Sequence, residues 1–140
     1  MPHPKKPADP NRQLMIKAKT CQRLRKEVEY YTKELKDNED QLQGMKDGNR
    51  DPYDIKYFEE VVGESRMIIP DSNRRLGAAV QDLANLMESA AESSEPEVQL
   101  TDEEWIATAK NILEQEKEFV TQEEAALSTN VDDLADEEAF

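Results

Sequence analysis

The chain has 140 residues, a net charge of −14 and one cysteine, Cys21, which together predict one domain without an internal disulfide. With 36% charged residues, 36% hydrophobic residues and only four glycines, the composition is typical of long helices and coiled coils. No run of 18 apolar residues and no apolar N-terminal stretch occurs, so we expect neither a membrane span nor a signal peptide.

Residues 1–10 hold four of the seven prolines and are expected to form a disordered arm. A helix over about 11–45 follows, capped by Asp9 or Asn11. Its apolar positions recur every seven residues, which favours coiled-coil-like packing. The first such row is Leu14, Cys21, Val28, Leu35 and Leu42. Cys21 is expected to be a core residue, and Asn38 either pairs with a partner polar group or faces water.

Residues 46–53 form a predicted turn, in which Gly48 can adopt the left-handed conformation and Pro52 stops the first helix. A second helix is expected over about 54–90, antiparallel to the first because the turn is short. One heptad row runs without a slip past Pro70, a residue that removes a hydrogen bond from a helix and favours a kink. That row is Ile55, Val62, Ile69, Leu76, Leu83 and Ala90.

A polar linker over 88–100 precedes a third helix, expected over about 101–127. Thr101 and Glu104 have the spacing of a capping box, and adjacent apolar pairs recur every seven residues from Trp105 onward. This wide stripe suits a helix that covers the groove between two others. Residues 128–140 are acidic and expected to be disordered. The predicted fold is therefore all-α, an elongated antiparallel three-helix bundle with its second helix kinked at Pro70.

The residue types needed for catalysis are scarce. The one histidine, His3, lies in the N-terminal arm without a second histidine to share a metal, and no Gly-rich phosphate loop or Cys/His cluster is present. We therefore expect no enzyme activity, no catalytic residues, no metal and no cofactor.

Charge is distributed unevenly along the chain. Residues 1–50 carry 12 basic and 8 acidic side chains, whereas residues 96–140 carry 2 and 14. A basic helix packed beside an acidic one explains this pattern, and a basic face for an acidic protein partner is the alternative. Nucleic acid is not an expected partner, because phosphate binding requires a dominant positive field.

Three segments of the second helix resemble the tubulin-specific chaperone A (tubulin-folding cofactor A) family. They are YDIK at Tyr53–Lys56, ESRMIIPD at Glu64–Asp71, and RRLGAA at Arg74–Ala79 followed by Asp82-Leu83. The resemblance is looser over the first helix and weak over the third. It implies a protein that captures β-tubulin released by the cytosolic chaperonin and holds it for α/β-tubulin assembly. It also implies a cytoplasmic, cytoskeleton-associated protein, with other tubulin-folding cofactors as further candidate partners.

The candidate β-tubulin surface centres on the kink, where adjacent apolar side chains beside arginines suit an interface. Its candidate residues are Tyr53, Asp54, Lys56, Arg66, Met67, Ile68, Pro70, Asp71, Arg74 and Arg75. Alternatively, Met67 and Ile68 pack under another helix, Pro70 is purely structural, and capping with core packing explains Tyr53, Asp54 and Lys56.

Two other functions compete with this prediction. The first is a structural coiled-coil scaffold, a homodimer without chaperone activity, which the first helix alone could support. The second is a general holdase, which is less favoured because the expected bundle ends are polar. For the chaperone we expect a monomer or a weak homodimer.

Overall fold

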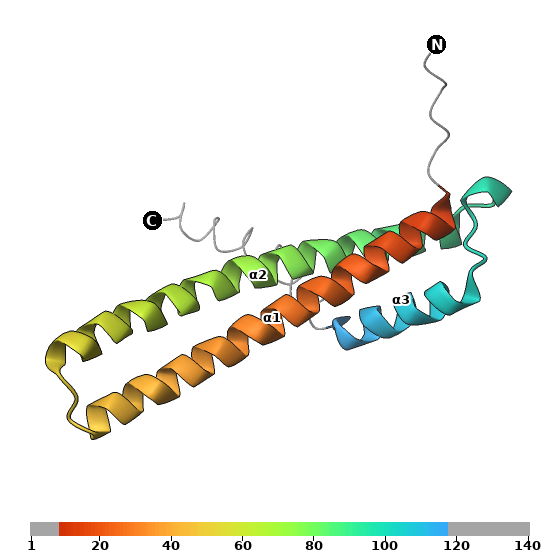
Figure 1. The fold of residues 1–140 in the computed structure, drawn as a ribbon. Coiled ribbons are helices and arrows are strands. Elements are labelled where there is room, and N and C mark those ends of the chain that lie inside the picture. Colours follow the sequence, from red (N-terminus) through yellow and green to blue (C-terminus); the bar gives the residue numbers. More distant parts are fainter. Residues whose placement is uncertain (1–8, 118–140) are drawn as a thin grey trace, which may run out of the picture. The chain divides into compact units, whose positions relative to one another are not determined.

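The computed structural model describes residues 9–117, which form three α-helices, one 3-10 helix and no strand. In chain order these are α1 (Pro10–Asp47), α2 (Pro52–Glu92), the 3-10 helix η1 (Pro96–Val98) and α3 (Glu103–Gln115) (Figure 1). The expected all-α, three-helix fold is confirmed. No described helix is long and apolar enough to cross a membrane. The predictions for the N-terminal arm, for the third helix beyond residue 117 and for the acidic tail lie outside the described residues.

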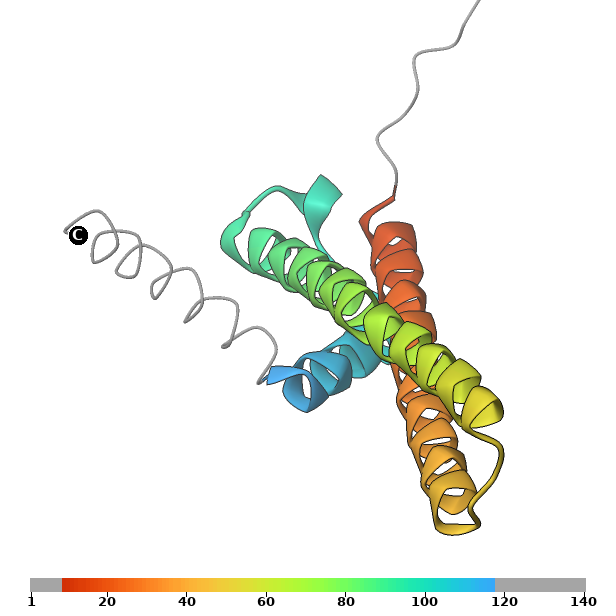
Figure 2. The ribbon, with the colours of Figure 1, turned by 90° about the vertical axis from the view of Figure 1, so that its left-hand side faces the viewer.

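The described residues divide into two compact units, and α1 and α2 contribute to both. Unit 1 contains residues 9–22 and 77–117, and unit 2 contains residues 23–76. Within unit 2, α1 and α2 form an antiparallel hairpin closed by the turn after Asp47, as Figure 1 and Figure 2 both show. The antiparallel pairing of the first two helices is therefore confirmed there.

The hairpin turn differs from the prediction by one residue. The residue in the left-handed conformation is Asn49, with φ 51°, rather than Gly48. Gly48 still donates its N–H to the carbonyl of Gly44 at 3.0 Å. The helix α1 therefore runs to Asp47, two residues beyond the expected end, and the left-handed residue is Asn49. Asparagine tolerates this conformation better than most residues.

The helix α2 begins two residues earlier than expected. The Oδ1 atom of Asp51 accepts a hydrogen bond from the N–H of Tyr53 at 2.9 Å, which makes Asp51 the N-cap. Pro52 then occupies the first helical position, where its missing N–H costs nothing. The proline that was expected to stop α1 thus also starts α2.

The heptad row of α2 continues past Pro70 as predicted. Its members are all buried or half-buried, and α2 is one helix on both sides of the proline. The kink at Pro70 stays a prediction. Within the interface of unit 2, the side-chain amide of Asn38 donates to the hydroxyl of Ser65 at 2.9 Å. This confirms the pairing alternative for Asn38 over the solvent-facing one.

Unit 1 has a fully buried core to which all three helices contribute. Cys21 belongs to this core, as expected, and its burial, with the nearby negative charges of Glu116 and Asp82, raises its pKa to about 11. A protonated, buried thiol is unreactive. The buried apolar residues of unit 1 are Leu14, Ala18, Cys21, Val80, Leu83, Ala90, Ala109 and Ile112.

The polar contacts at the start of α1 correct the expected cap of the third helix. Asp9 caps α1, since its Oδ1 atom accepts from the N–H of Asn11 at 3.1 Å. Asn11 instead holds the segment before α3. Its amide donates to the Thr101 hydroxyl at 3.0 Å and accepts from the N–H of Thr101 at 2.9 Å. With Thr101 engaged in this way, Asp102 is the N-cap of α3, accepting from the N–H of Trp105 at 3.3 Å.

Candidate functional site

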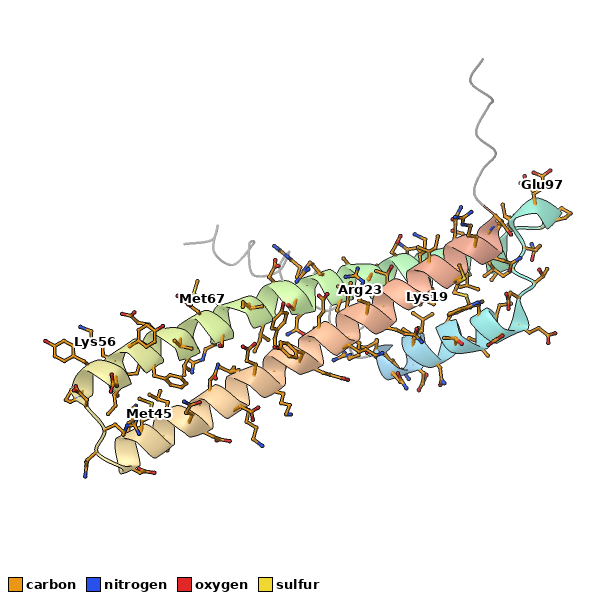
Figure 3. The ribbon with its side chains drawn as sticks, in the orientation of Figure 1. Lys19, Arg23, Met45, Lys56, Met67 and Glu97 are labelled. Atoms are coloured by element: carbon orange, nitrogen blue, oxygen red, sulfur yellow. The ribbon has the colours of Figure 1, made fainter. Side chains whose placement is uncertain are left out.

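One face of α2 in unit 2 carries half of the ten candidate residues. Successive members are separated by three, four or eleven residues, that is, by about one or three helical turns, so they share one side of the helix. We call this the outer face of α2, and it consists of Tyr53, Lys56, Met67, Asp71 and Arg74, all exposed. Figure 3 shows Lys56 and Met67 projecting on the same side of α2, away from α1.

The exposed apolar groups on this helix argue against the alternative that they pack under another helix. Met67 is 77% exposed and Ile68 is 41% exposed, so neither is packed in a core. Tyr53 is 84% exposed, and the cap of α2 is Asp51, so capping and core packing do not explain Tyr53. Isolated exposed apolar residues are common, but here two adjacent ones lie between arginines on a helix that otherwise buries its apolar row.

The remaining candidates lie beside the outer face. Arg66 reaches back to α1, where its guanidinium lies 3.0 Å from Oε1 of Glu39. Pro70 is exposed between Met67 and Asp71. Asp54 is not brought to the outer face. It lines a surface groove of about 740 Å³ near the hairpin turn.

That groove was not anticipated from the sequence. Its wall combines the end of α1 around Gly44 with the aromatic start of α2. The space beside Gly44 is open, since a Cβ atom added there would meet no atom within 4 Å. The lining residues are Gln41, Gly44, Met45, Gly48, Arg50, Asp54, Tyr57 and Phe58. The spacing of Tyr57 from Tyr53, one helical turn, was the signal that could have added this exposed tyrosine to the candidates.

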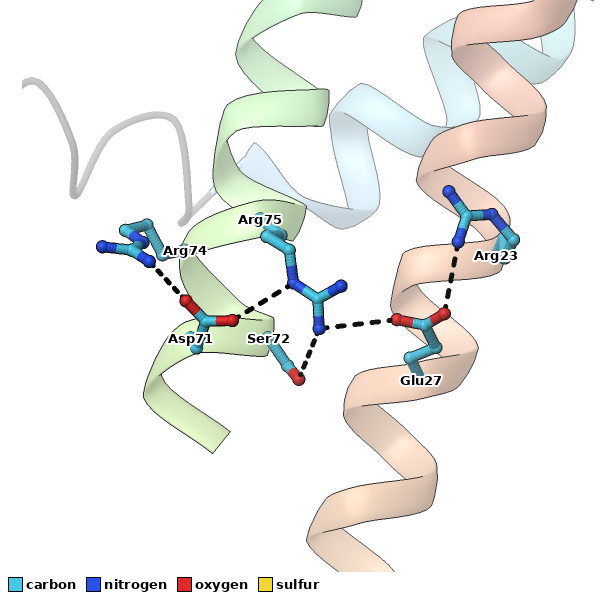
Figure 4. A network of polar contacts seen from close by, with 6 residues as sticks. All are labelled: Arg23, Glu27, Asp71, Ser72, Arg74 and Arg75. Atoms are coloured by element: carbon cyan, nitrogen blue, oxygen red, sulfur yellow. Dashed lines mark hydrogen bonds and ion pairs between the residues drawn. The ribbon is translucent and has the colours of Figure 1, made fainter. Parts of the chain in front are cut away.

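Arg75 belongs to a network of charged side chains that connects both helices of unit 2 (Figure 4). Its Nε atom lies 3.4 Å from Asp71, which also binds Arg74, and its Nη2 atom lies 3.8 Å from Glu27 on α1. Glu27 in turn pairs with Arg23 at 3.2 Å. The sequence predicted Asp71 with Arg74 or Arg75 from their one-turn spacing; the participation of Glu27 and Arg23 depends on the pairing of α1 with α2.

The described residues contain no group of three or more metal-ligating side chains. The outer face combines the exposed apolar side chains of Tyr53 and Met67 with the charged side chains of Lys56, Asp71 and Arg74. Such a surface can contact another polypeptide through buried apolar area and charge pairs.

The chain was compared with known proteins. Residues 9–113 match the family model described as "Tubulin binding cofactor A". Tubulin-folding cofactor A from Arabidopsis thaliana is 38% identical over 112 residues, covering 80% of this chain and 96% of the relative. Tubulin-specific chaperone A from Homo sapiens is 43% identical over 91 residues, covering 64% and 84%.

Solved structures agree with these sequence relatives. The crystal structure of tubulin folding cofactor A from Arabidopsis thaliana matches this chain with a TM-score of 0.62. A structure described as a β-tubulin binding post-chaperonin cofactor matches with a TM-score of 0.54 at 30% identity, and this match covers 73% of this chain and 98% of that one. The family match spans most of the described residues, including all of α1 and α2. This chain belongs to the tubulin binding cofactor A family.

Proposed function

We propose that this chain is a tubulin-folding chaperone that captures β-tubulin after the chaperonin and holds it on the way to α/β-tubulin assembly. Family membership supports the role, and a structural neighbour is described as a β-tubulin binding post-chaperonin cofactor. Within this proposal the chain acts by binding in the cytoplasm, without a cofactor, as a monomer or weak homodimer. Other tubulin-folding cofactors are further proposed partners, met when β-tubulin is passed on.

The observation that carries the choice of surface is the exposure of Met67 on the outer face of α2. A methionine adapts its shape to irregular partners, and Ile68, Arg74 and Arg75 all lie within eight residues of it on the same helix. Large apolar side chains at the centre of an interface, with charged groups at its rim, contribute most of the binding energy. We propose that β-tubulin covers this face, with Tyr53 and Lys56 toward one end.

Replacing Met67 by glutamate tests this surface directly. Burying the new carboxylate without a partner should weaken β-tubulin capture by roughly tenfold or more, whereas helical content should be unchanged because position 67 is exposed. The measurement is co-purification with β-tubulin and, separately, with α-tubulin. The matched control is Ile16→Glu, since Ile16 is 49% exposed on α1 in unit 1, outside the proposed surface.

Equal capture by wild type, Met67→Glu and Ile16→Glu would contradict the assignment of this face. Retention of α-tubulin in preference to β-tubulin would contradict the proposed client.

A structural homodimer is the second candidate function, and the half-buried interface of unit 2 favours it. Leu35, Leu42, Met45 and Phe58 each retain partial exposure, so a second copy could cover them. Sedimentation equilibrium at micromolar concentration distinguishes the two. A purely scaffolding protein must dimerise there, so a monomer would eliminate this candidate, whereas the chaperone proposal accommodates either state.

A further inference from the structure

We propose that an arginine cluster in unit 2 binds a carboxylate-rich segment of the captured polypeptide. The arginine cluster consists of Arg23, Arg74 and Arg75, held by Glu27 and Asp71 (Figure 4). This inference rests on the proposed function and extends the binding surface from α2 onto α1.

Arg75 is the fixed centre of the cluster. Its guanidinium lies 3.4 Å from Asp71 on its own helix and 3.8 Å from Glu27 on α1, and it also donates to the hydroxyl of Ser72 at 3.4 Å. Contacts from two helices restrict the rotation of this long side chain before any partner arrives. A pre-oriented guanidinium loses less conformational entropy when it binds.

Arg23 and Arg74 are the open sides of the cluster. Among the described contacts each pairs with a single carboxylate, Arg23 with Glu27 and Arg74 with Asp71, and their side chains are 64% and 78% exposed. A guanidinium carries five N–H donors in a planar fork. Most of the donors of these two arginines therefore face water, oriented by the carboxylates that they already contact.

The charge balance favours an anionic partner. Three guanidinium groups meet two carboxylates in the cluster, whereas the other described ion pairs of unit 2, Lys46 with Glu59 and Arg66 with Glu39, are one to one. The surplus positive charge lies on a chain whose net charge is −14. Carboxylates bind guanidinium forks with two parallel hydrogen bonds, so an acidic peptide segment fits the open donors.

The proposal predicts opposite effects on binding when an arginine of the cluster is replaced and when Glu27, one of the carboxylates that hold it, is replaced. Removing a guanidinium should weaken the binding of an acidic segment, whereas removing Glu27 should strengthen it, because Glu27 competes with the incoming carboxylates for Arg23. A network that only tied α1 to α2 would lose stability in both cases and would give no such reversal.

The experiment uses the full chain and a fluorescein-labelled octaglutamate peptide, with octaglutamine as the uncharged peptide control, followed by anisotropy over a series of salt concentrations. Arg23→Gln should raise the dissociation constant for octaglutamate roughly fivefold and flatten its salt dependence. Glu27→Gln should lower that constant roughly threefold. Lys46→Gln is the matched control, since it removes one charge from a one-to-one pair in the same unit. Thermal unfolding of each variant verifies the fold.

β-tubulin co-purification with the same variants connects the cluster to the client and should change in the same order. Unchanged octaglutamate and β-tubulin binding by folded Arg23→Gln, or equal weakening by Arg23→Gln and Glu27→Gln, would overturn the inference. Failure of the wild-type chain to retain β-tubulin, with the octaglutamate results as expected, would instead overturn the proposed function and leave the acidic-peptide site in place.

Discussion

Unit 1 packs segments of three helices, whereas unit 2 packs two. In unit 1 the cation of Lys19 lies 5.6 Å from the centre of the Trp105 ring, connecting α1 with α3, and Leu14, Val80 and Leu83 are fully buried. In unit 2 burial decreases toward the hairpin turn, where Leu42 and Phe58 are only half-buried. A pair of helices has too little width to enclose its apolar side chains, and a third helix supplies the missing cover.

This difference concerns how much of each unit is enclosed. The three-helix packing of unit 1 provides a closed core, whereas the two helices of unit 2 leave much of their circumference uncovered by the described residues. All of the proposed contact residues lie in unit 2. Under the proposed function, substitutions on the contact surface should therefore leave the core of unit 1 intact.

The largest expected effect concerns core stability. Leu83→Ala in unit 1 should lower the free energy of unfolding by about 3 kcal/mol, because it opens a cavity in a closed core. Leu42→Ala in unit 2 should cost about 1 kcal/mol, since the half-buried leucine loses less apolar contact. Urea denaturation followed by circular dichroism measures both losses. Equal losses would show that unit 2 encloses its apolar side chains as completely as unit 1 does.

Cys21 probes how well the core of unit 1 excludes water. Its pKa is raised from 9.0 to about 11, which leaves roughly a hundredfold less thiolate at pH 8 than an ordinary cysteine has. Iodoacetamide should therefore label Cys21 in the native chain at least roughly a hundredfold more slowly than in the urea-unfolded chain. The folded state retains its proton between pH 9 and 11 while the unfolded state loses it, so stability should fall as pH rises through this interval.

A cysteine in unit 2 provides the comparison for this labelling. Leu42→Cys, combined with Cys21→Ala, should react faster than Cys21 in the native chain because position 42 is half-buried. Slower labelling at position 42 would reverse the proposed order of the two units.

The cap of α3 tests how firmly the third helix is attached. Asp102→Ala should destabilise the chain by about 1 kcal/mol, because the N–H of Trp105 loses its acceptor. Thr101→Val, which removes only the hydroxyl that Asn11 contacts, should cost less. Thermal unfolding of the two variants gives the order, and a larger loss for Thr101→Val would restore threonine as the dominant residue at this helix start.

The smallest effect is expected in the interface of unit 2. Asn38→Ala should cost about 0.5–1 kcal/mol, because it leaves the half-buried hydroxyl of Ser65 without its donor. Adding Ser65→Ala should recover part of that loss. A double-mutant cycle by urea denaturation measures the coupling, and strictly additive losses would mean that the pair contributes nothing beyond its separate residues.

Several features of the fold followed from the sequence because they depend on local spacing. Heptad rows predicted three helices and the burial of Cys21 and Leu76, since every seventh residue returns to nearly the same side of a helix. The prediction erred by one residue at Gly48 and Thr101, where a neighbouring side chain or a continuing hydrogen bond shifted the end of the helix. Helix ends depend on individual contacts, which spacing alone does not specify.

Only part of the candidate site could be proposed from the sequence, because residue spacing does not specify contacts between helices. Met67, Asp71 and Arg74 could be proposed together because they lie on one helix, at spacings that place them on one face. The contribution of Glu27 to Arg75, and the exposure of Tyr57 beside the groove at Gly44, required knowing which residues of α1 lie opposite α2.

The amino-acid order by itself thus determined that the chain forms amphipathic helices, the ends of the first two helices and the start of the third to within a few residues, and which family it resembles. The tertiary structure decided which helix faces remain open: the exposure of Met67, the joining of Arg23 to Arg75 through Glu27, and the choice of Asp102 over Thr101 as a cap. The physical reason is one of range. A helix arises from interactions within a few residues, whereas an exposed face or an ion-pair network depends on residues brought together from distant parts of the chain.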